Sequence, residues 1–118
     1  MAELRKDVID HIVDWAEVHR DAKELVRKLV GSGEWNGIIA VTRGGLVPAA
    51  IIAREMGIRH IDTLCIATYD EQYIGDVHVI KKPAEAVRDK GKGWLMIDDL
   101  VDTGMTMKTA REFLPNCH

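Results

Sequence analysis

The feature that most limits how this chain can fold is an apolar run that ends abruptly in two acids. Residues 94–97 are apolar, and Asp98 and Asp99 follow them directly. An apolar run of this length, with Gly93 before it, is typical of a central strand in a parallel sheet that is covered on both faces. The sequence therefore predicts a strand that delivers two carboxylates to one edge of an α/β sheet.

A loop suited to phosphate follows the acid pair. Asp102, Thr103, Gly104 and Thr106 supply hydroxyl groups and unhindered backbone amides, and a helix is expected from residue 105 until Pro115 stops it. Amides and hydroxyls at the start of a helix favour phosphate binding. The sequence contains neither the Gly-x-x-x-x-Gly-Lys-Ser/Thr pattern nor the Gly-x-Gly-x-x-Gly pattern of other phosphate loops.

A second strand also ends in a glycine turn. Residues 38–41 are apolar, residues 42–45 read Thr-Arg-Gly-Gly, and a helix is expected over residues 49–56. Paired glycines let backbone amides approach an anion, and Arg43 can hold phosphate oxygens with two N–H groups. Taken alone, the turn could equally be a plain strand-to-helix connection with a solvated arginine. Because loops at the carboxyl ends of neighbouring strands converge on one crevice, we expect Arg43 and Asp98 to share a site.

The remaining segments predict one α/β domain over residues 1–118. Apolar residues recur at spacings of three and four between residues 16 and 30, which indicates an amphipathic helix. The other expected elements are a strand over 61–66, an edge strand over 77–82 and a helical turn over 84–88. Residues 11–15 could be an edge strand or part of a longer helix, and we favour a short strand.

The composition is that of a globular protein and argues against several other classes. The chain has 118 residues, a net charge of -3, 30% charged residues and 47% hydrophobic residues, which argues against a basic nucleic-acid binder. No apolar stretch approaches the roughly 20 residues that span a bilayer. Cys65 and Cys117 are too few and too scattered for a disulfide framework, so the sequence favours reduced thiols and a cytoplasmic location.

Residues 97–106 (IDDLVDTGMT) resemble the phosphoribosyl diphosphate signature of the type I phosphoribosyltransferases. Residues 38–54 (IIAVTRGGLVPAAIIAR) and 57–69 (GIRHIDTLCIATY) extend the likeness specifically to the bacterial xanthine-guanine phosphoribosyltransferases. This resemblance implies an open, mostly parallel sheet flanked by helices. It also implies a Mg²⁺-dependent enzyme of purine salvage, which transfers the 5-phosphoribosyl group from phosphoribosyl diphosphate to N9 of guanine, xanthine or hypoxanthine. Members of this family are usually tetramers, cytoplasmic or loosely associated with the inner membrane.

The resemblance also implies roles for individual residues. Arg43 and Gly44 would contact the diphosphate, Asp98 and Asp99 would hold the ribose hydroxyls, and Asp99 would also meet Mg²⁺. Asp102 would face N7 of the purine as the catalytic proton-transfer residue, and Thr103 to Thr106 would surround the 5-phosphate. The complete substrate-binding set implied in this way is Arg43, Gly44, Asp98, Asp99, Leu100, Val101, Asp102, Thr103, Gly104, Met105 and Thr106.

The sequence departs from the family pattern in two ways. The mobile loop of the family carries an arginine that reaches the diphosphate, but Gly75 stands at that place, which leaves Lys81 or Lys82 as substitutes. The family also continues past the position of His118 with a strand whose lysine reads the purine 6-oxo group, and with a hood that stacks on the base. We therefore expect the 118-residue chain to bind magnesium phosphoribosyl diphosphate weakly and to turn over guanine poorly.

Two alternatives remain at the level of the sequence. One is a non-catalytic regulatory module that binds phosphoribosyl diphosphate but has lost transfer activity. The other is a phosphoribosyltransferase for another base, because the segments that select the base lie beyond His118 in the family. Retention of Asp102 favours an enzyme, whereas the absence of the purine hood favours the regulatory module.

Overall fold

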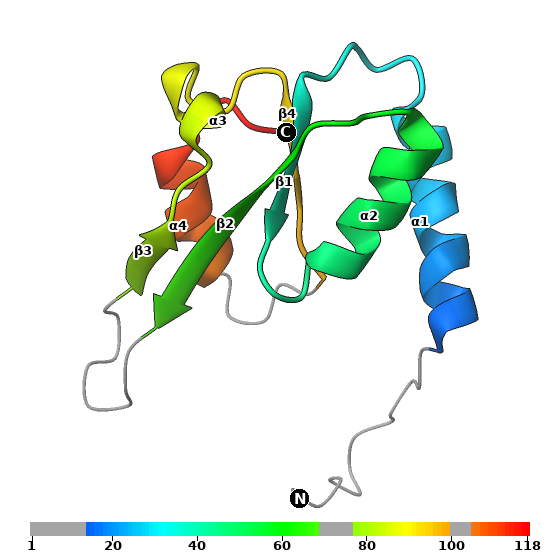
Figure 1. Cartoon of the computed structure of the whole chain (residues 1–118), viewed down its shortest axis with the longest axis horizontal. Helices are drawn as coiled ribbons and strands as arrows, with labels where there is room; N and C mark the ends of the chain where they lie inside the picture. The colour runs from blue at the N-terminus through cyan, green and yellow to red at the C-terminus, as the bar shows by residue number, and fades with distance from the viewer. Residues whose placement is uncertain (1–13, 69–76, 100–104) are drawn as a thin grey trace, which may run out of the picture.

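The computed structural model of the chain describes residues 14–68, 77–99 and 105–118. Within these residues helices and strands alternate, as an α/β fold requires (Figure 1). The elements are α1 (Trp15–Leu29), β1 (Gly37–Val41), α2 (Leu46–Met56), β2 (Ile61–Thr68), β3 (Val77–Lys81), α3 (Ala84–Arg88), β4 (Trp94–Ile97) and α4 (Met105–Phe113). No helix among the described residues is long and apolar enough to cross a membrane.

The described strands form one sheet in the order β3-β2-β1-β4. β1 pairs in parallel with both β2 and β4, and β3 pairs antiparallel with the outer edge of β2. The predicted edge strand over residues 77–82 is thus confirmed as β3. The prediction that residues 94–97 form a central strand is wrong for the described part of the sheet, because β4 lies at its end.

The burial of β4 explains why its sequence reads like that of a central strand. Trp94, Leu95 and Ile97 are all buried, since helices cover both faces of the sheet at this strand. The edge of β4 that faces away from β1 is also hydrogen-bonded. The amide of Met96 donates to the carbonyl of His118 at 2.8 Å. The amide of His118 in turn donates to the carbonyl of Trp94 at 3.0 Å.

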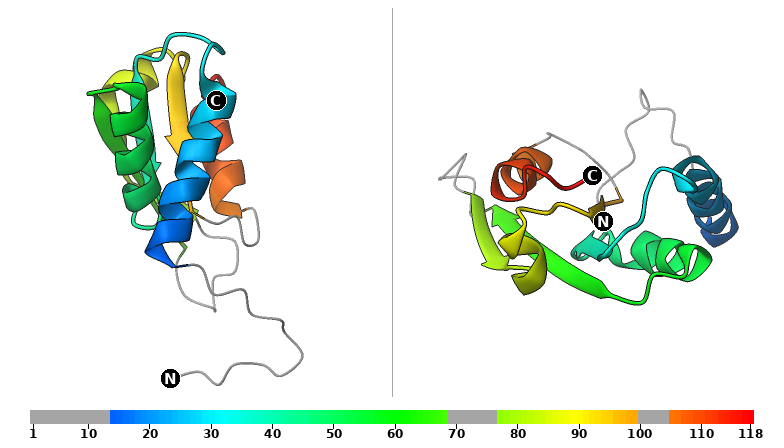
Figure 2. Two further views of the ribbon diagram at one scale, coloured as in Figure 1. Left: turned by 90° about the vertical axis from the view of Figure 1, so that its right-hand side faces the viewer. Right: turned by 90° about the horizontal axis from the view of Figure 1, so that it is seen from above.

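The core is divided between the two faces of the sheet. On one face, Ile38 and Ala40 of β1 pack with the buried side of α2 and with Ala22 and Val26 of α1. On the other face, Ile39 and Val41 pack with α3 and α4. This alternation along β1 follows from the two-residue period of a strand. The two views of Figure 2 show α1 and α2 together on one side of the sheet and α4 on the other.

The predicted strand over residues 11–15 is wrong where the structure describes it, because Trp15 is the first residue of α1. Asp14 caps this helix by accepting a hydrogen bond from the amide of Glu17 at 2.8 Å. An N-cap oxygen of this kind satisfies an amide that has no partner inside the helix. The rest of the strand prediction, residues 11–13, lies outside the described residues.

Helix α2 begins three residues before the expected start at Ala49. Pro48 does not interrupt the helix. It lies in the first turn, where the missing N–H of a proline costs no hydrogen bond. The helix ends at Gly57, whose φ of 69° is the left-handed conformation that favours glycine at a helix C-terminus. The predicted strand over residues 61–66 is confirmed and extends to Thr68.

Candidate functional site

The turn after β1 is held tightly against the ends of its neighbours. The amide of Thr42 donates to the carbonyl of Leu64 in β2 at 2.9 Å, and the amide of Gly45 donates back to Val41 at 2.8 Å. The peptide bond between Thr42 and Arg43 is cis. Arg43 and Gly44 are exposed, whereas Gly45 is buried. Arg43 and the backbone of Gly44 are therefore exposed to solvent, while hydrogen bonds on either side hold the turn in place.

Gly45 was not singled out as a functional residue, but the geometry gives it a structural role. A Cβ at this position would overlap the carbonyl oxygen of Ile97 and would lie 2.8 Å from the carbonyl oxygen of Val41. Only a residue without a side chain therefore fits between the ends of β1 and β4. The paired glycines in the sequence were the signal for this close approach.

The acid pair lies at the carboxyl end of β4, as predicted for Asp98 and Asp99. The register of the sheet pairs Ala40 of β1 with Ile97 of β4, so the two strands end beside each other. Asp98 accepts a hydrogen bond from the amide of Asp99 at 2.8 Å. Asp98 is half-buried and Asp99 is exposed.

The turn after β1 and the acid pair after β4 meet directly. A Cβ built on Gly44 would overlap the carboxylate of Asp99, so the side chain of Asp99 already occupies the space above Gly44. Figure 1 shows both segments at the same end of the sheet. Arg43, which is adjacent to Gly44, is thereby brought to the crevice that holds Asp99. We call this place the crevice, defined by Arg43, Gly44, Asp98 and Asp99.

The carboxyl of Asp98 has a raised pKa in this crevice. Burial raises the pKa of the Asp98 carboxyl above its ordinary value of 3.8, and the hydrogen bond from the amide of Asp99 works against this rise. The carboxyl of Asp99 raises the pKa of Asp98 further, first through a hydrogen bond between the two carboxyl groups and then through the repulsion of two negative charges at short range. A cation bound between the two carboxylates would relieve this repulsion.

The donor set of the crevice fits Mg²⁺. Magnesium prefers oxygen ligands and is usually held by one or two carboxylates together with substrate phosphates, so it does not need a cage of protein ligands. Asp98 and Asp99 supply such carboxylates side by side. Among the described residues, including those of the crevice, no group of three or more histidine, cysteine or acidic side chains could hold a metal ion.

The predicted phosphate loop is described only at its end. Leu100, Val101, Asp102, Thr103 and Gly104 lie outside the described residues. Met105 is the first residue of α4, and Thr106 in its first turn is half-buried. The predicted helix after residue 104 is thus confirmed, and its N-terminus directly follows the loop expected to receive the phosphate.

The suggestion that Lys81 or Lys82 replaces the missing loop arginine stays a prediction, because residues 69–76, where the arginine of the family would lie, are outside the described residues. β3 runs antiparallel to β2, and Lys81 pairs with Cys65, the residue after Leu64, which is itself the partner of Val41 at the end of β1. The ammonium of Lys81 donates to the carboxylate of Asp62 and, at 3.1 Å, to the carbonyl of Thr63. Lys82 lies over the ring of Phe113, 5.6 Å from its centroid. Both cations therefore have structural partners.

Comparison with known sequences identifies one family. The family described as the phosphoribosyl transferase domain matches residues 8–118. Among curated proteins, the xanthine-guanine phosphoribosyltransferase of Nitratidesulfovibrio vulgaris strain DP4 is 50% identical over 106 residues. That match covers 90% of this chain and 63% of the relative, so the chain spans less than two thirds of the relative's length.

Comparison with solved structures agrees on the fold. The xanthine-guanine-hypoxanthine phosphoribosyltransferase of Helicobacter pylori superposes with a TM-score of 0.73 at 21% identity, covering 89% of this chain and 68% of that one. A hypoxanthine-guanine phosphoribosyltransferase of Bacillus anthracis superposes with a TM-score of 0.69 at 26% identity, covering 90% and 64% of the two chains. The described sheet and helices therefore have the arrangement found in these proteins.

Proposed function

Because the chain belongs to the phosphoribosyl transferase domain family, we propose that it forms the phosphoribosyl diphosphate-binding part of a purine phosphoribosyltransferase. The reaction would transfer the 5-phosphoribosyl group from phosphoribosyl diphosphate to N9 of a 6-oxopurine and release diphosphate. The observation that carries this proposal is the contact between Gly44 and the Asp99 carboxylate. It brings a cationic glycine turn and an acid pair into one crevice, which is what a sugar bearing a diphosphate requires.

The choice of a 6-oxopurine as acceptor rests on the relatives. Two proteins named xanthine-guanine phosphoribosyltransferase are 50% and 49% identical to this chain over 106 residues. Guanine, xanthine and hypoxanthine share the 6-oxo group and the N9 position, so one site can serve all three. We also infer from this likeness that the protein acts in the cytoplasm as a homo-oligomer.

Each residue of the crevice has a proposed task. Arg43 and the amide of Gly44 would neutralise the leaving diphosphate, Arg43 by a planar pair of N–H donors. Asp98 and Asp99 would accept hydrogen bonds from the ribose hydroxyls. Transfer passes through a ribose with positive character at C1, which nearby carboxylates stabilise.

Asp102 and the following residues complete the set. Asp102 would hold or take the proton at N7 of the purine while the new bond forms at N9. The amides and hydroxyls of Thr103, Gly104, Met105 and Thr106 would surround the 5-phosphate at the start of α4. Leu100 and Val101 connect the acid pair to this loop and would line the ribose between them.

Mg²⁺ is the proposed cofactor, with Asp99 as its protein ligand and Asp98 beside it. The raised pKa of Asp98, which burial and the neighbouring carboxylate cause, supports a site that gains from a bound cation. When bound, the ion would supply positive charge against the diphosphate oxygens. The remaining stabilisation comes from Arg43 and the backbone amides.

A non-catalytic regulatory module is the second candidate. Such a module would bind phosphoribosyl diphosphate without using Asp102.

Replacing Asp102 by Asn separates the two candidates. With enzyme in molar excess over guanine, we expect slow release of diphosphate from the unmodified chain and no release from the Asp102→Asn variant. Both proteins should bind magnesium phosphoribosyl diphosphate with similar affinity. Release that is absent from both proteins, with binding retained in both, would favour the regulatory module. An absence of binding would contradict both candidates.

A further inference from the structure

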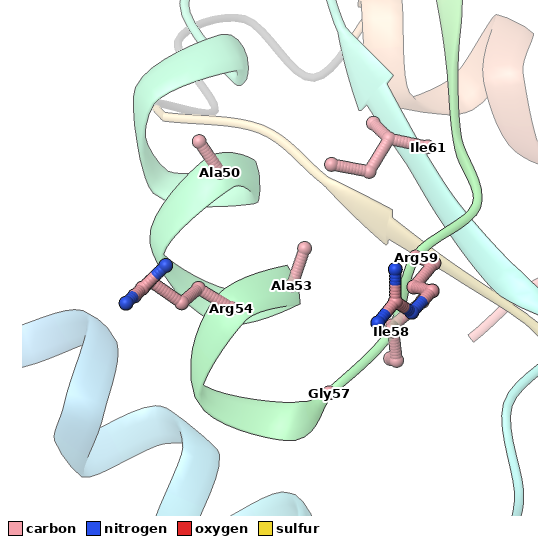
Figure 3. A pocket seen from close by; sticks show the side chains of 7 residues that line it. All are labelled: Ala50, Ala53, Arg54, Gly57, Ile58, Arg59 and Ile61. Atoms are coloured by element: carbon pink, nitrogen blue, oxygen red, sulfur yellow. The ribbon is translucent and has the colours of Figure 1, made fainter.

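A hollow of about 500 Å³ lies beside the C-terminal half of α2. Ala50 and Ala53 of α2 stand on one side of it, and Ile61 of β2 stands on the other (Figure 3). Ile58, in the connection between the helix and the strand, also lines it. Sites for small molecules in proteins usually have volumes of about 300–1,000 Å³. The hollow is therefore large enough to hold a small organic molecule.

This hollow is separate from the crevice. The turn that carries Arg43 precedes the first residue of α2, whereas the residues that line the hollow run from Ala50 to Ile61. None of the four residues that define the crevice is among them. A molecule in the hollow would thus leave the crevice open to a ligand of its own.

The walls of the hollow are apolar. Apart from two arginines, no side chain that lines it carries a polar atom. Ile61 is 41% exposed, and Ala50 is also exposed. An apolar chain placed between the two walls would remove these side chains from water, which is favourable. The small side chains on the helix leave room for such a chain.

Arg59 adds a positive charge to this apolar site. Figure 3 shows its guanidinium group at the edge of the gap, next to Ile58. The side chain of Arg59 has no ion pair or hydrogen bond to any residue that the structure describes. A guanidinium group can hold both oxygens of a carboxylate with two parallel N–H groups. Arg59 is thus available to bind an anion whose apolar part lies in the hollow.

Arg54 borders the same hollow but is oriented differently. Figure 3 shows its guanidinium group on the outer side of α2, towards α1 and away from Ile61. It therefore contributes the same charge as Arg59 without reaching into the gap. The two arginines form a matched pair, in which only one is placed to contact a ligand.

We propose that the hollow between α2 and β2 is a binding site for a free medium-chain carboxylate. The acyl chain lies between Ala53 and Ile61, and Arg59 holds the carboxylate. The charges are complementary, because no acidic side chain lines the hollow to neutralise Arg59. Binding does not involve phosphoribosyl diphosphate, so its test is independent of the proposed function.

The test titrates the chain with octanoate at pH 7 and follows the methyl resonances of Ala50, Ala53 and Ile61 by NMR. We expect saturable shifts that are confined to the methyl groups lining the hollow. 1-Octanol has the same number of carbons without the charge and should bind about tenfold more weakly or worse. The absence of saturable shifts at millimolar octanoate, or equally tight binding of 1-octanol, would overturn the proposal.

Arg59→Gln should weaken octanoate binding by about tenfold or more. Arg54→Gln is the matched control, because it removes the same charge from a residue that borders the same hollow. We expect it to change the dissociation constant by about twofold or less, since a charge that does not touch the carboxylate is screened by solvent. Equal losses in the two variants would indicate a general attraction of anions to a basic surface and would overturn the site.

Ala50→Leu tests the apolar part of the site. Ala50 is exposed on α2, and leucine is nearly as favourable as alanine in a helix, so the variant should keep its circular dichroism spectrum. The larger side chain would occupy the hollow and should weaken octanoate binding by about tenfold or more. Unchanged binding to this variant would place the acyl chain elsewhere and would overturn the proposal.

Discussion

At the scale of single residues, Gly44 leaves no room for a side chain beside the Asp99 carboxylate. Gly44→Ala must therefore displace either the turn or the carboxylate. Because Gly44 is exposed, we expect little change in melting temperature but a loss of affinity for magnesium phosphoribosyl diphosphate of about tenfold or more. Isothermal titration with a parallel thermal melt would measure both quantities.

Gly57→Ala is the control, because it should lower the stability of the protein and leave its affinity for the substrate unchanged. Gly57 has a positive φ and open space around it, at the end of α2 remote from the crevice. An alanine there should cost about 1–2 kcal/mol of stability, because the left-handed conformation is unfavourable for other residues. Its affinity for the substrate should stay unchanged. If both variants lost affinity equally, the specific contact between Gly44 and Asp99 would not explain the result.

Asp98 should weaken the fold at neutral pH when no cation is bound. Burial and the neighbouring carboxyl raise its pKa in the folded state, so the folded protein holds this proton more tightly than the unfolded chain does. Its contribution to stability is therefore fully present below the ordinary pKa of 3.8 and is lost as pH rises through the folded pKa.

Asp98→Asn should thus raise the melting temperature at pH 7, and the gain should disappear as pH falls below the ordinary pKa. The asparagine oxygen can still accept the hydrogen bond from the amide of Asp99. Thermal melts of both proteins across this pH range would measure the difference. A variant that is less stable than the unmodified chain at pH 7 would show that the repulsion between the carboxylates is not the dominant effect.

The sequence predicted the chemistry of individual residues and the approach of Arg43 to Asp98, but it did not predict which atoms meet. The pattern after residue 97 indicated two carboxylates at a strand end, and the structure places them there. The meeting of Gly44 with Asp99 depends on β1 lying next to β4, which no local pattern specifies. The partners of Lys81 and Lys82 were missed for the same reason, since they depend on the antiparallel pairing of β3.

At the scale of elements, Asp62 and Lys81 tie β2 to β3. Burial alone would raise the pKa of Asp62, but the hydrogen bond from Lys81 and that from the amide of Thr63 outweigh it and hold the pKa below 3.8. For a carboxyl with a lowered pKa, the contribution to stability is present above the ordinary value. It is lost as pH falls through the folded pKa.

Lys81→Met should therefore destabilise the chain at pH 7 by about 0.5–1.5 kcal/mol, since it leaves Asp62 without its charged partner. The difference should shrink in acid, once Asp62 is protonated. Lys82→Met is the control, because Lys82 lies over the Phe113 ring and makes no contact with Asp62 in the described structure. Urea denaturation at two pH values would compare the free energies of unfolding of the two variants. Equal losses of stability in both would rule out a specific role for the ion pair.

Helices and strands were predicted well wherever apolar periodicity was strong, as in α1, β1 and β2. The error at Trp15 arose because β-branched residues before it suggested a strand. Asp14 followed three residues later by Glu17 was the available signal for a helix start. The error at β4 arose because burial on both faces produces the same apolar run at the end of a sheet as at its centre.

At the scale of the whole molecule, the chain covers 63% of the Nitratidesulfovibrio relative. Joining to His118 the strand and hood that the family resemblance places after this position should supply the contacts that position the purine. We expect guanine-dependent diphosphate release to rise by about a hundredfold, because catalysis depends steeply on substrate placement. Affinity for phosphoribosyl diphosphate should change much less. An extended chain that is no faster would indicate a regulatory module.

The central claim is that the turn after β1 and the acids after β4 hold one molecule of phosphoribosyl diphosphate together. Calorimetric titration of the chain with this compound, with and without Mg²⁺, tests it directly beside Arg43→Ala and Asp99→Asn. We predict saturable, magnesium-dependent binding that each substitution weakens by about tenfold or more. The absence of binding at millimolar concentrations, or binding that neither substitution alters, would contradict the claim.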